Sequence, residues 1–178
     1  MKLFFCMAVS LFLAINSLYA APSDKSRIQI ESIVPRKVIL IPGSVEGGTI
    51  GNTSSKGIRA VFPAEEEWKK GSFTFNPEED GSLYLQLMGE WASVPEDRSW
   101  IIFDKVSATG TTIPNGDFEE NLRHWWKCGK DKLAEIVDEN SDNGKKAVKV
   151  NHDNPVAVKI EVRKNHPVTV TFFYKIAE

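Results

Sequence analysis

The segment Val-Ala-Val-Lys-Ile-Glu-Val at residues 156–162 carries valine or isoleucine at every second position. Residues 165–167, Asn-His-Pro, are a turn signal, and Val-Thr-Val-Thr-Phe-Phe-Tyr follows at residues 168–174. Side chains of a β-strand point alternately to opposite faces, so a repeat of two predicts a strand with one buried face. This part of the chain therefore predicts two consecutive strands joined by a tight turn.

The same signals extend outward over most of the chain. Short alternating or apolar segments are separated by turn-forming residues, and they lie at 28–33, 38–41, 58–62, 72–75, 83–88, 100–106, 134–137 and 147–151. The glycine-rich residues 43–57 predict a long loop, and only residues 64–70 and 119–126 favour short helices. Many short strands at this spacing predict an all-β sandwich or barrel.

The first twenty residues have the pattern of a secretory signal. A lysine supplies the positive start, an apolar run follows, and Ala20 is the expected cleavage position. The run is too short to span a membrane, which takes about 20 residues, and no later segment is apolar enough. We therefore expect residues 1–20 to be a signal peptide, 21–26 to be flexible, and 27–178 to form one β-sandwich domain. The mature protein would be periplasmic, cell-surface or extracellular.

Charge and cysteine content narrow the class of protein further. The chain has 178 residues, with 22 lysines and arginines and 24 aspartates and glutamates. Loss of the signal removes one lysine and no acid, which takes the net charge from −2 to −3. Nucleic-acid binding requires a basic face, so we expect no nucleic-acid partner. The only other cysteine, Cys6, lies in the expected signal, so Cys128 would have no internal disulfide partner after cleavage. We expect its thiol to be buried close to Trp125 and Trp126.

Residues 115–125, Asn-Gly-Asp-Phe-Glu-Glu-Asn-Leu-Arg-His-Trp, are the most specific motif in the chain. They resemble the opening strand of galactose-binding-domain-like jelly rolls, especially bacterial carbohydrate-binding modules with an Asn-Gly-x-Phe-Glu…Trp pattern. The resemblance implies a jelly-roll β-sandwich with Trp125 in its core. Strand alternation would place Phe118 in the core as well, with Asp117 and Glu119 on the opposite face.

Two parts of the chain resemble the halves of such a domain in reverse order. Residues 112–178 are similar to the first half and residues 27–108 to the second half, with 100–106 similar to the closing strand. A circularly permuted sandwich and two truncated domains both explain this order. Half a sandwich would expose an apolar face and open strand edges, whereas a jelly roll with adjacent termini tolerates permutation. We favour the single permuted domain, and the other alternative stays open.

The resemblance also implies a structural calcium site. In the resembled modules, one acid of the opening strand and one of the closing strand often help to hold the ion. The corresponding residues here are Glu119 and Asp104, with Asp117 as an additional ligand. Calcium prefers several oxygen ligands, including carboxylates and carbonyls. Lys105 stands where the family often has a second aspartate, and the alternative is that these acids are ordinary surface carboxylates.

Five tryptophans are many for a chain of this length. Aromatic faces stack against the apolar side of sugar rings, and neighbouring polar groups bind the hydroxyls. We expect Trp125 and Trp100 in the core, whereas Trp68, Trp91 and Trp126 are the candidates for ligand contact. Trp91 lies in a polar loop after a predicted strand, where binding residues are common.

These features favour an exported, non-catalytic, lectin-like protein that binds a glycan or polysaccharide. The acidic clusters lie beside predicted turns, where carboxylates are usually solvated, and the sequence has no zinc-ligand spacing, nucleophile elbow or phosphate-binding loop. We therefore expect no enzyme activity. The alternative is a structural or protein-interaction component of the cell envelope, which would present a broad apolar patch or an open edge strand to a protein partner.

Overall fold

The computed structural model describes residues 26–32, 38–50, 57–63 and 65–177. The expected signal peptide lies outside these residues, and Ser26, expected in a flexible N-terminus, already belongs to the first strand. Among the described residues, no helix is both long enough and apolar enough to cross a membrane.

The described residues form twelve β-strands and one short 3-10 turn, η1, at Pro95–Asp97. The strands are β1 (Ser26–Ser32), β2 (Val38–Glu46), β3 (Thr49–Ile50), β4 (Gly57–Phe62), β5 (Lys69–Pro77), β6 (Gly81–Gly89), β7 (Ile101–Thr109), β8 (Trp125–Lys127), β9 (Glu135–Val137), β10 (Ala147–Val150), β11 (Val156–Val162) and β12 (Val168–Ile176). The all-β fold that the alternating pattern predicts is therefore confirmed.

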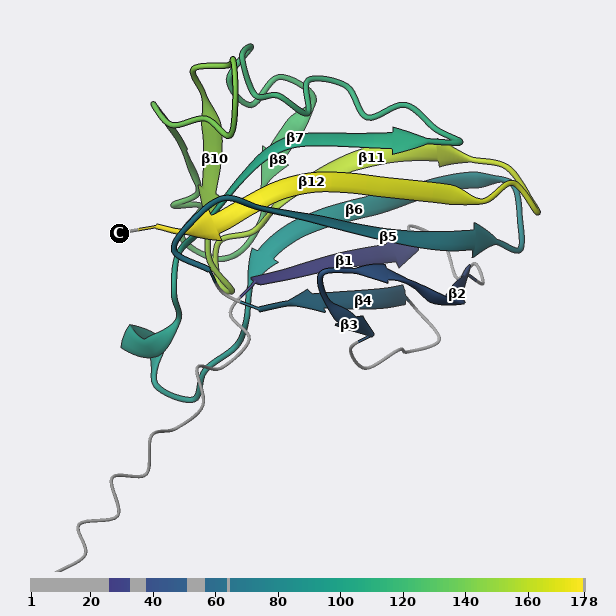
Figure 1. Cartoon of the computed structure of the whole chain (residues 1–178), viewed down its shortest axis with the longest axis horizontal. Coiled ribbons are helices and arrows are strands. Elements are labelled where there is room, and N and C mark those ends of the chain that lie inside the picture. Colours follow the sequence, from purple (N-terminus) through teal and green to yellow (C-terminus); the bar gives the residue numbers. More distant parts are fainter. Residues whose placement is uncertain (1–25, 33–37, 51–56, 64, 178) are drawn as a thin grey trace, which may run out of the picture.

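The strands form two six-stranded antiparallel sheets (Figure 1). Sheet A has the order β3-β4-β1-β6-β11-β8, and sheet B has the order β2-β5-β12-β7-β10-β9. The two consecutive strands that the sequence predicts at 156–162 and 168–174 are β11 and β12. They lie in different sheets, so the turn between them crosses the sandwich. Each sheet contains strands from 27–108 and strands from 112–178, so the two segments are interleaved.

One apolar core lies between the two sheets. Leu83, Leu85 and Leu87 of β6 are buried, and so are the alternate residues of β11 and β12. Phe62 of sheet A meets Phe172 of sheet B edge to face, with ring centroids 4.8 Å apart. Side chains of both sheets belong to the same buried cluster, as a β-sandwich requires.

The segment from Asn115 to His124 is a series of turns, so the predicted opening strand and the alternation argued for it are wrong. Asn115, Phe118, Asn121 and His124 all have positive φ, between 49° and 70°, which an extended strand cannot contain. The Asn115 side chain donates hydrogen bonds to the carbonyls of Asn121 and Arg123, and so competes with a strand ladder. Phe118 is buried against Trp125, as expected, although it reaches the core from a turn.

Among the residues that the structure describes, neither predicted helix forms. Residues 65–68 run beside the end of β12, where the Ile176 N–H donates to the Glu65 carbonyl, and β5 begins at Lys69. Residues 119–124 belong to the turns described above, and β8 follows them. The predicted long loop is also shorter than expected, because β2 continues to Glu46 and β3 pairs with β4.

Candidate functional site

Sheet A carries an aromatic pair on its outer face, which is the face turned away from the core. Leu83 and Leu85 are buried, so Tyr84 between them points outward. In β8, Trp125 is buried and Trp126 is 39% exposed. The rings of Tyr84 and Trp126 meet edge to face, with centroids 5.0 Å apart and planes at 87°. Strand alternation thus presents two aromatic rings side by side at the surface.

Strand β11 lies between β6 and β8 and determines what surrounds the aromatic pair. Ala157 is paired with Trp126 on one side and Gln86 on the other, and Lys159 is paired with Tyr84. The small side chain of Ala157 lets the larger side chains of the neighbouring strands approach each other above it. We call the four side chains of Tyr84, Gln86, Trp126 and Lys159 the outer platform.

The outer platform combines flat apolar rings with hydrogen-bonding groups. The phenol hydroxyl, the Gln86 amide and the Lys159 ammonium are polar groups beside the rings. Lys159 Nζ lies 3.1 Å from Glu161 Oε1, which also accepts a hydrogen bond of 2.6 Å from the Ser82 hydroxyl. Such a surface suits a ligand that is apolar on one side and rich in hydroxyl groups at its rim.

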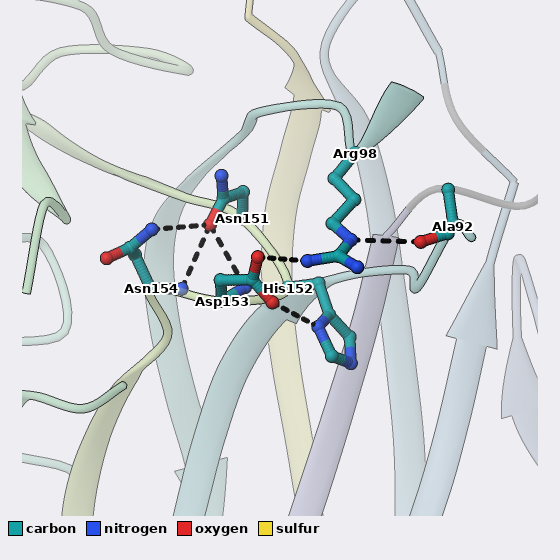
Figure 2. A network of polar contacts seen from close by, with 6 residues as sticks. All are labelled: Ala92, Arg98, Asn151, His152, Asp153 and Asn154. Carbon is teal, nitrogen blue, oxygen red and sulfur yellow. Dashed lines mark hydrogen bonds and ion pairs between the residues drawn. The ribbon is translucent and has the colours of Figure 1, made fainter. Parts of the chain in front are cut away.

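Trp91 lies in the loop between β6 and β7 and is 55% exposed, as the sequence predicted. The loop is anchored by Arg98, whose Nε donates to the Ala92 carbonyl at 2.9 Å. A second nitrogen of the same guanidinium contacts the Asp153 carboxylate (Figure 2). The exposed indole therefore extends from a loop with a fixed base.

The Asp153 carboxylate joins this loop to the turn that precedes β11 (Figure 2). Its Oδ1 lies 2.8 Å from His152 Nδ1, and its other oxygen faces Arg98. The hydrogen bond to His152 lowers the pKa of Asp153 most, partial burial opposes this, and Arg98 lowers the pKa further. Asn151 Oδ1 accepts the backbone N–H groups of Asp153 and Asn154 at 3.1 and 2.9 Å, which fixes the turn itself.

Trp68 and Trp100 are both half-buried beside lysines. Lys175 Nζ lies 5.6 Å from the centroid of the Trp68 ring, and Lys149 Nζ lies 5.6 Å from that of Trp100. One face of each indole is therefore covered by an ammonium group. Trp68 is less open to a ligand than Trp91 and Trp126, and the expectation that Trp100 lies in the core is wrong.

The thiol of Cys128 is only half-buried, so the expectation that it is buried is wrong. Its Sγ lies 3.8 Å from the Trp126 carbonyl oxygen. The position near Trp126 is as expected. The residue lies at the end of β8, where the strand leaves sheet A and the sandwich no longer covers it.

Asp104, the first predicted calcium ligand, is 1% exposed and accepts hydrogen bonds on both carboxylate oxygens. Its Oδ1 accepts the Lys105 N–H at 2.6 Å, and its Oδ2 accepts the N–H and the hydroxyl of Ser141 at 2.9 and 2.8 Å. The Lys105 ammonium binds Asp142 at 2.7 Å. Protein donors thus satisfy the buried carboxylate.

Glu119, the second predicted ligand, binds backbone N–H groups. Its Oε1 accepts those of Lys145 at 2.6 Å and Lys146 at 3.1 Å. The Lys145 bond lowers the pKa of Glu119 most, desolvation opposes this, and Lys146 lowers it further. Asp117 Oδ1 accepts the Glu119 N–H at 3.5 Å, and the Lys146 ammonium reaches the Glu119 carbonyl at 3.4 Å and Asn121 Oδ1 at 3.0 Å.

These contacts do not fit a calcium ion. Among the described residues, no three His, Cys, Asp or Glu side chains converge as metal ligands would. Calcium requires six to eight oxygen ligands, whereas Asp104 and Glu119 face N–H and O–H donors and Lys146 supplies a positive charge nearby. The resemblance and these contacts thus give opposite expectations for calcium binding by Asp104, Glu119 and Asp117, and melting with and without calcium distinguishes them.

Two residues of these surfaces, Tyr84 and Arg98, are not among the site residues that the sequence predicts. Tyr84 had a usable signal, because it alternates with Leu83 and Leu85 and its outward position follows from that pattern. Arg98 lies in an irregular loop, and its partner Asp153 is 55 residues away. No local pattern predicts such a contact.

The sequence matches no protein-family model, and no curated protein matches it. A β-sandwich supports many unrelated functions, so the fold alone assigns none. The side chains at the surface, above all those of the outer platform, therefore have to indicate the function.

Proposed function

We propose that this protein is an exported, non-catalytic carbohydrate-binding protein whose outer platform contacts a glycan or polysaccharide. The observation that carries the proposal is the edge-to-face contact of Tyr84 with Trp126, at 5.0 Å, on the solvent side of sheet A. The contact holds the two rings in a fixed mutual orientation, so little side-chain freedom is lost when a sugar stacks on the face of one of them. Gln86 and Lys159 provide partners for the sugar hydroxyls.

The resemblance to galactose-binding-domain-like jelly rolls supports the same class. Residues 115–125 carry the residues of its opening motif, although they form turns and not a strand up to His124, and the segments similar to the two halves occur in reverse order. Strands of both segments share both sheets, as a circularly permuted single sandwich requires. We therefore favour permutation over two truncated domains.

Trp91 is proposed as a second aromatic contact. It is the most exposed tryptophan among the candidates, and the Arg98 contacts fix the loop that carries it. A shallow platform buries little ligand surface, so we expect modest affinity for a single site.

Isothermal titration calorimetry with a panel of oligosaccharides tests the proposal. Trp126→Ala should weaken binding about twofold to tenfold, because an aromatic contact contributes about 0.5–1.5 kcal/mol. Trp126→Phe should retain most of the affinity, and Trp68→Phe, just before β5 of the other sheet, should have no effect. Melting curves establish that each variant is folded. If the folded protein binds no oligosaccharide of a broad panel, the proposal is wrong.

A structural or interaction role in the cell envelope is the second candidate. Val94 and Leu133 are 47% and 57% exposed, and an exposed apolar side chain contributes to a protein interface when it belongs to a contiguous apolar patch. Light scattering at increasing concentration would test this role. Self-association that Leu133→Asp abolishes, in a protein without glycan affinity, would favour it over carbohydrate binding.

A further inference from the structure

An open cavity of about 870 Å³ adjoins the outer platform at the C-terminal end of β11. Ligand pockets commonly have about 300–1,000 Å³, so the cavity is large enough for a sugar unit. Its polar lining consists mainly of Asp80, Thr111, Lys159, Glu161, Arg163 and His166. Lys159 belongs to both the cavity and the platform, because it is paired with Tyr84 in the sheet. The two surfaces are therefore continuous.

Hydrogen bonds to the β5–β6 turn fix the wall that carries Arg163 and His166. The Lys164 N–H donates to Asp80 Oδ1 at 2.7 Å, and the Asn165 N–H donates to the Pro77 carbonyl at 2.8 Å. The turn after β11 is thereby held against the turn before β6. The Arg163 and His166 backbones have fixed positions before any ligand binds.

A second part of the cavity wall is fixed by the segment that follows β7. The Thr111 hydroxyl donates to the Glu161 carbonyl at 2.6 Å. Gly110 has a φ of +84°, and a Cβ there would lie 2.3 Å from the Pro167 carbonyl oxygen. Only glycine allows this close approach, so both parts of the cavity wall are built into the fold.

The charged side chains of the cavity differ in whether other groups of the protein contact them. The Glu161 carboxylate contacts the Lys159 ammonium and the Ser82 hydroxyl, and Asp80 uses one oxygen for the Lys164 N–H. His166 Nδ1 donates to the Lys164 carbonyl at 2.9 Å. Within the described part of the chain, Arg163 makes no ion pair, and its side chain is exposed. The cavity thus contains a guanidinium group that is available to an anionic ligand.

We propose that the cavity binds a uronic acid unit of an acidic oligosaccharide, with Arg163 pairing with the sugar carboxylate. This inference rests on the proposed function, because the rest of the same oligosaccharide would lie on the outer platform. A guanidinium group presents two parallel N–H donors that match the geometry of a carboxylate. Asp80 and Glu161 accept hydrogen bonds from the sugar hydroxyls.

Distance along the strand indicates the minimum size of the ligand. Ala157, below the platform, and Glu161, in the cavity, are four residues apart on β11, which corresponds to about 13 Å. A single sugar ring stacked on Trp126, which is paired with Ala157, does not extend as far as Glu161. The ligand is therefore an oligosaccharide whose neighbouring units occupy the platform and the cavity.

Calorimetry with matched ligand pairs tests the inference. The probes are uronic acid oligosaccharides, such as oligogalacturonate, each beside its neutral counterpart with reduced carboxyl groups. The wild type should bind the acidic member about twofold to fivefold more tightly, because an ion pair with an exposed guanidinium contributes up to about 1 kcal/mol. Arg163→Gln should remove this preference, whereas Trp126→Ala should weaken both members equally. Arg123→Gln, an exposed arginine paired with Glu120, is the matched control and should change neither.

The outcomes separate the two proposals. If both members of each pair bind equally well and Arg163→Gln has no effect, the inference is wrong and the proposed function remains. If a sulfated oligosaccharide binds more tightly than every uronic acid probe, and Arg163→Gln abolishes that difference, the carboxylate assignment is wrong. If no oligosaccharide binds at all, both proposals are wrong. The acidic preference should also decrease as salt increases, because salt screens the Arg163 charge.

Discussion

Replacing Arg98 with alanine removes both contacts that anchor the Trp91 loop. One is the hydrogen bond from Nε to the Ala92 carbonyl, at 2.9 Å, and the other is the ion pair with Asp153. The substitution leaves the His152–Asp153 hydrogen bond in place. We therefore expect a specific loss of loop anchoring in an otherwise intact sandwich.

The structure sets the size of the expected effect. A hydrogen bond to a neutral carbonyl contributes about 1 kcal/mol. The Arg98 side chain is 15% exposed and that of Asp153 is 41% exposed, so solvent partly screens their ion pair, and we assign it about 1 kcal/mol. The total of about 2 kcal/mol corresponds to a decrease in Tm of about 4–8 °C for a domain of this size.

Thermal unfolding followed by circular dichroism measures the effect. Arg123→Ala is the matched control, because Arg123 makes an exposed ion pair with Glu120 three residues away. Such an exposed pair contributes about 0.2–0.5 kcal/mol, so the control should shift Tm by about 1 °C. Equal shifts in the two variants would refute the argument that the Arg98 contacts hold the loop.

The effect of Arg98→Ala should also depend on pH. The fold lowers the pKa of Asp153 below its ordinary value of 3.8. The contacts of this carboxylate therefore contribute stability above about pH 4, and the contribution is lost as the pH falls through the folded-state pKa. The destabilisation should be smaller at pH 3 than at pH 7, and an unchanged value would contradict the role of the Asp153 charge.

Three further predictions concern the core, a close contact and the metal. Phe172→Ala should lower the free energy of unfolding, measured with denaturant, by about 3–5 kcal/mol, because its ring is fully buried against Phe62. A decrease below about 1 kcal/mol would contradict this packing. Gly116→Ala should lower the stability by about 1–3 kcal/mol, since its Cβ would lie 1.8 Å from the Val106 carbonyl oxygen; an unchanged Tm would show that this approach is not tight. Because N–H and O–H donors of the protein already bind the carboxylates of Asp104 and Glu119, the Tm should be the same with calcium and with EDTA. A calcium-dependent rise that Glu119→Gln abolishes would instead support the sequence prediction of a metal site.

The strand faces could be predicted from the sequence, and the turns of the 115–124 segment could not. Leu83 and Leu85 alternate with Tyr84, and the pattern identifies the buried and the exposed side chains without knowledge of the partner strands. In the 115–124 segment, the Asn115 side chain bonds to nearby backbone groups, and these bonds replace the expected strand. Local competition of this kind depends on three-dimensional detail that a residue pattern does not contain.

By itself, the sequence determined the all-β class, the repeat of two along the strands and the exposure of Trp126 and Trp91. These properties follow from local geometry and from the burial of apolar side chains. Only the tertiary structure decided that Trp126 contacts Tyr84 and that Lys159 connects the platform to the cavity of Arg163. The reason is that strand order results from pairing between segments far apart in the chain, and the stability of each pair depends on the whole core.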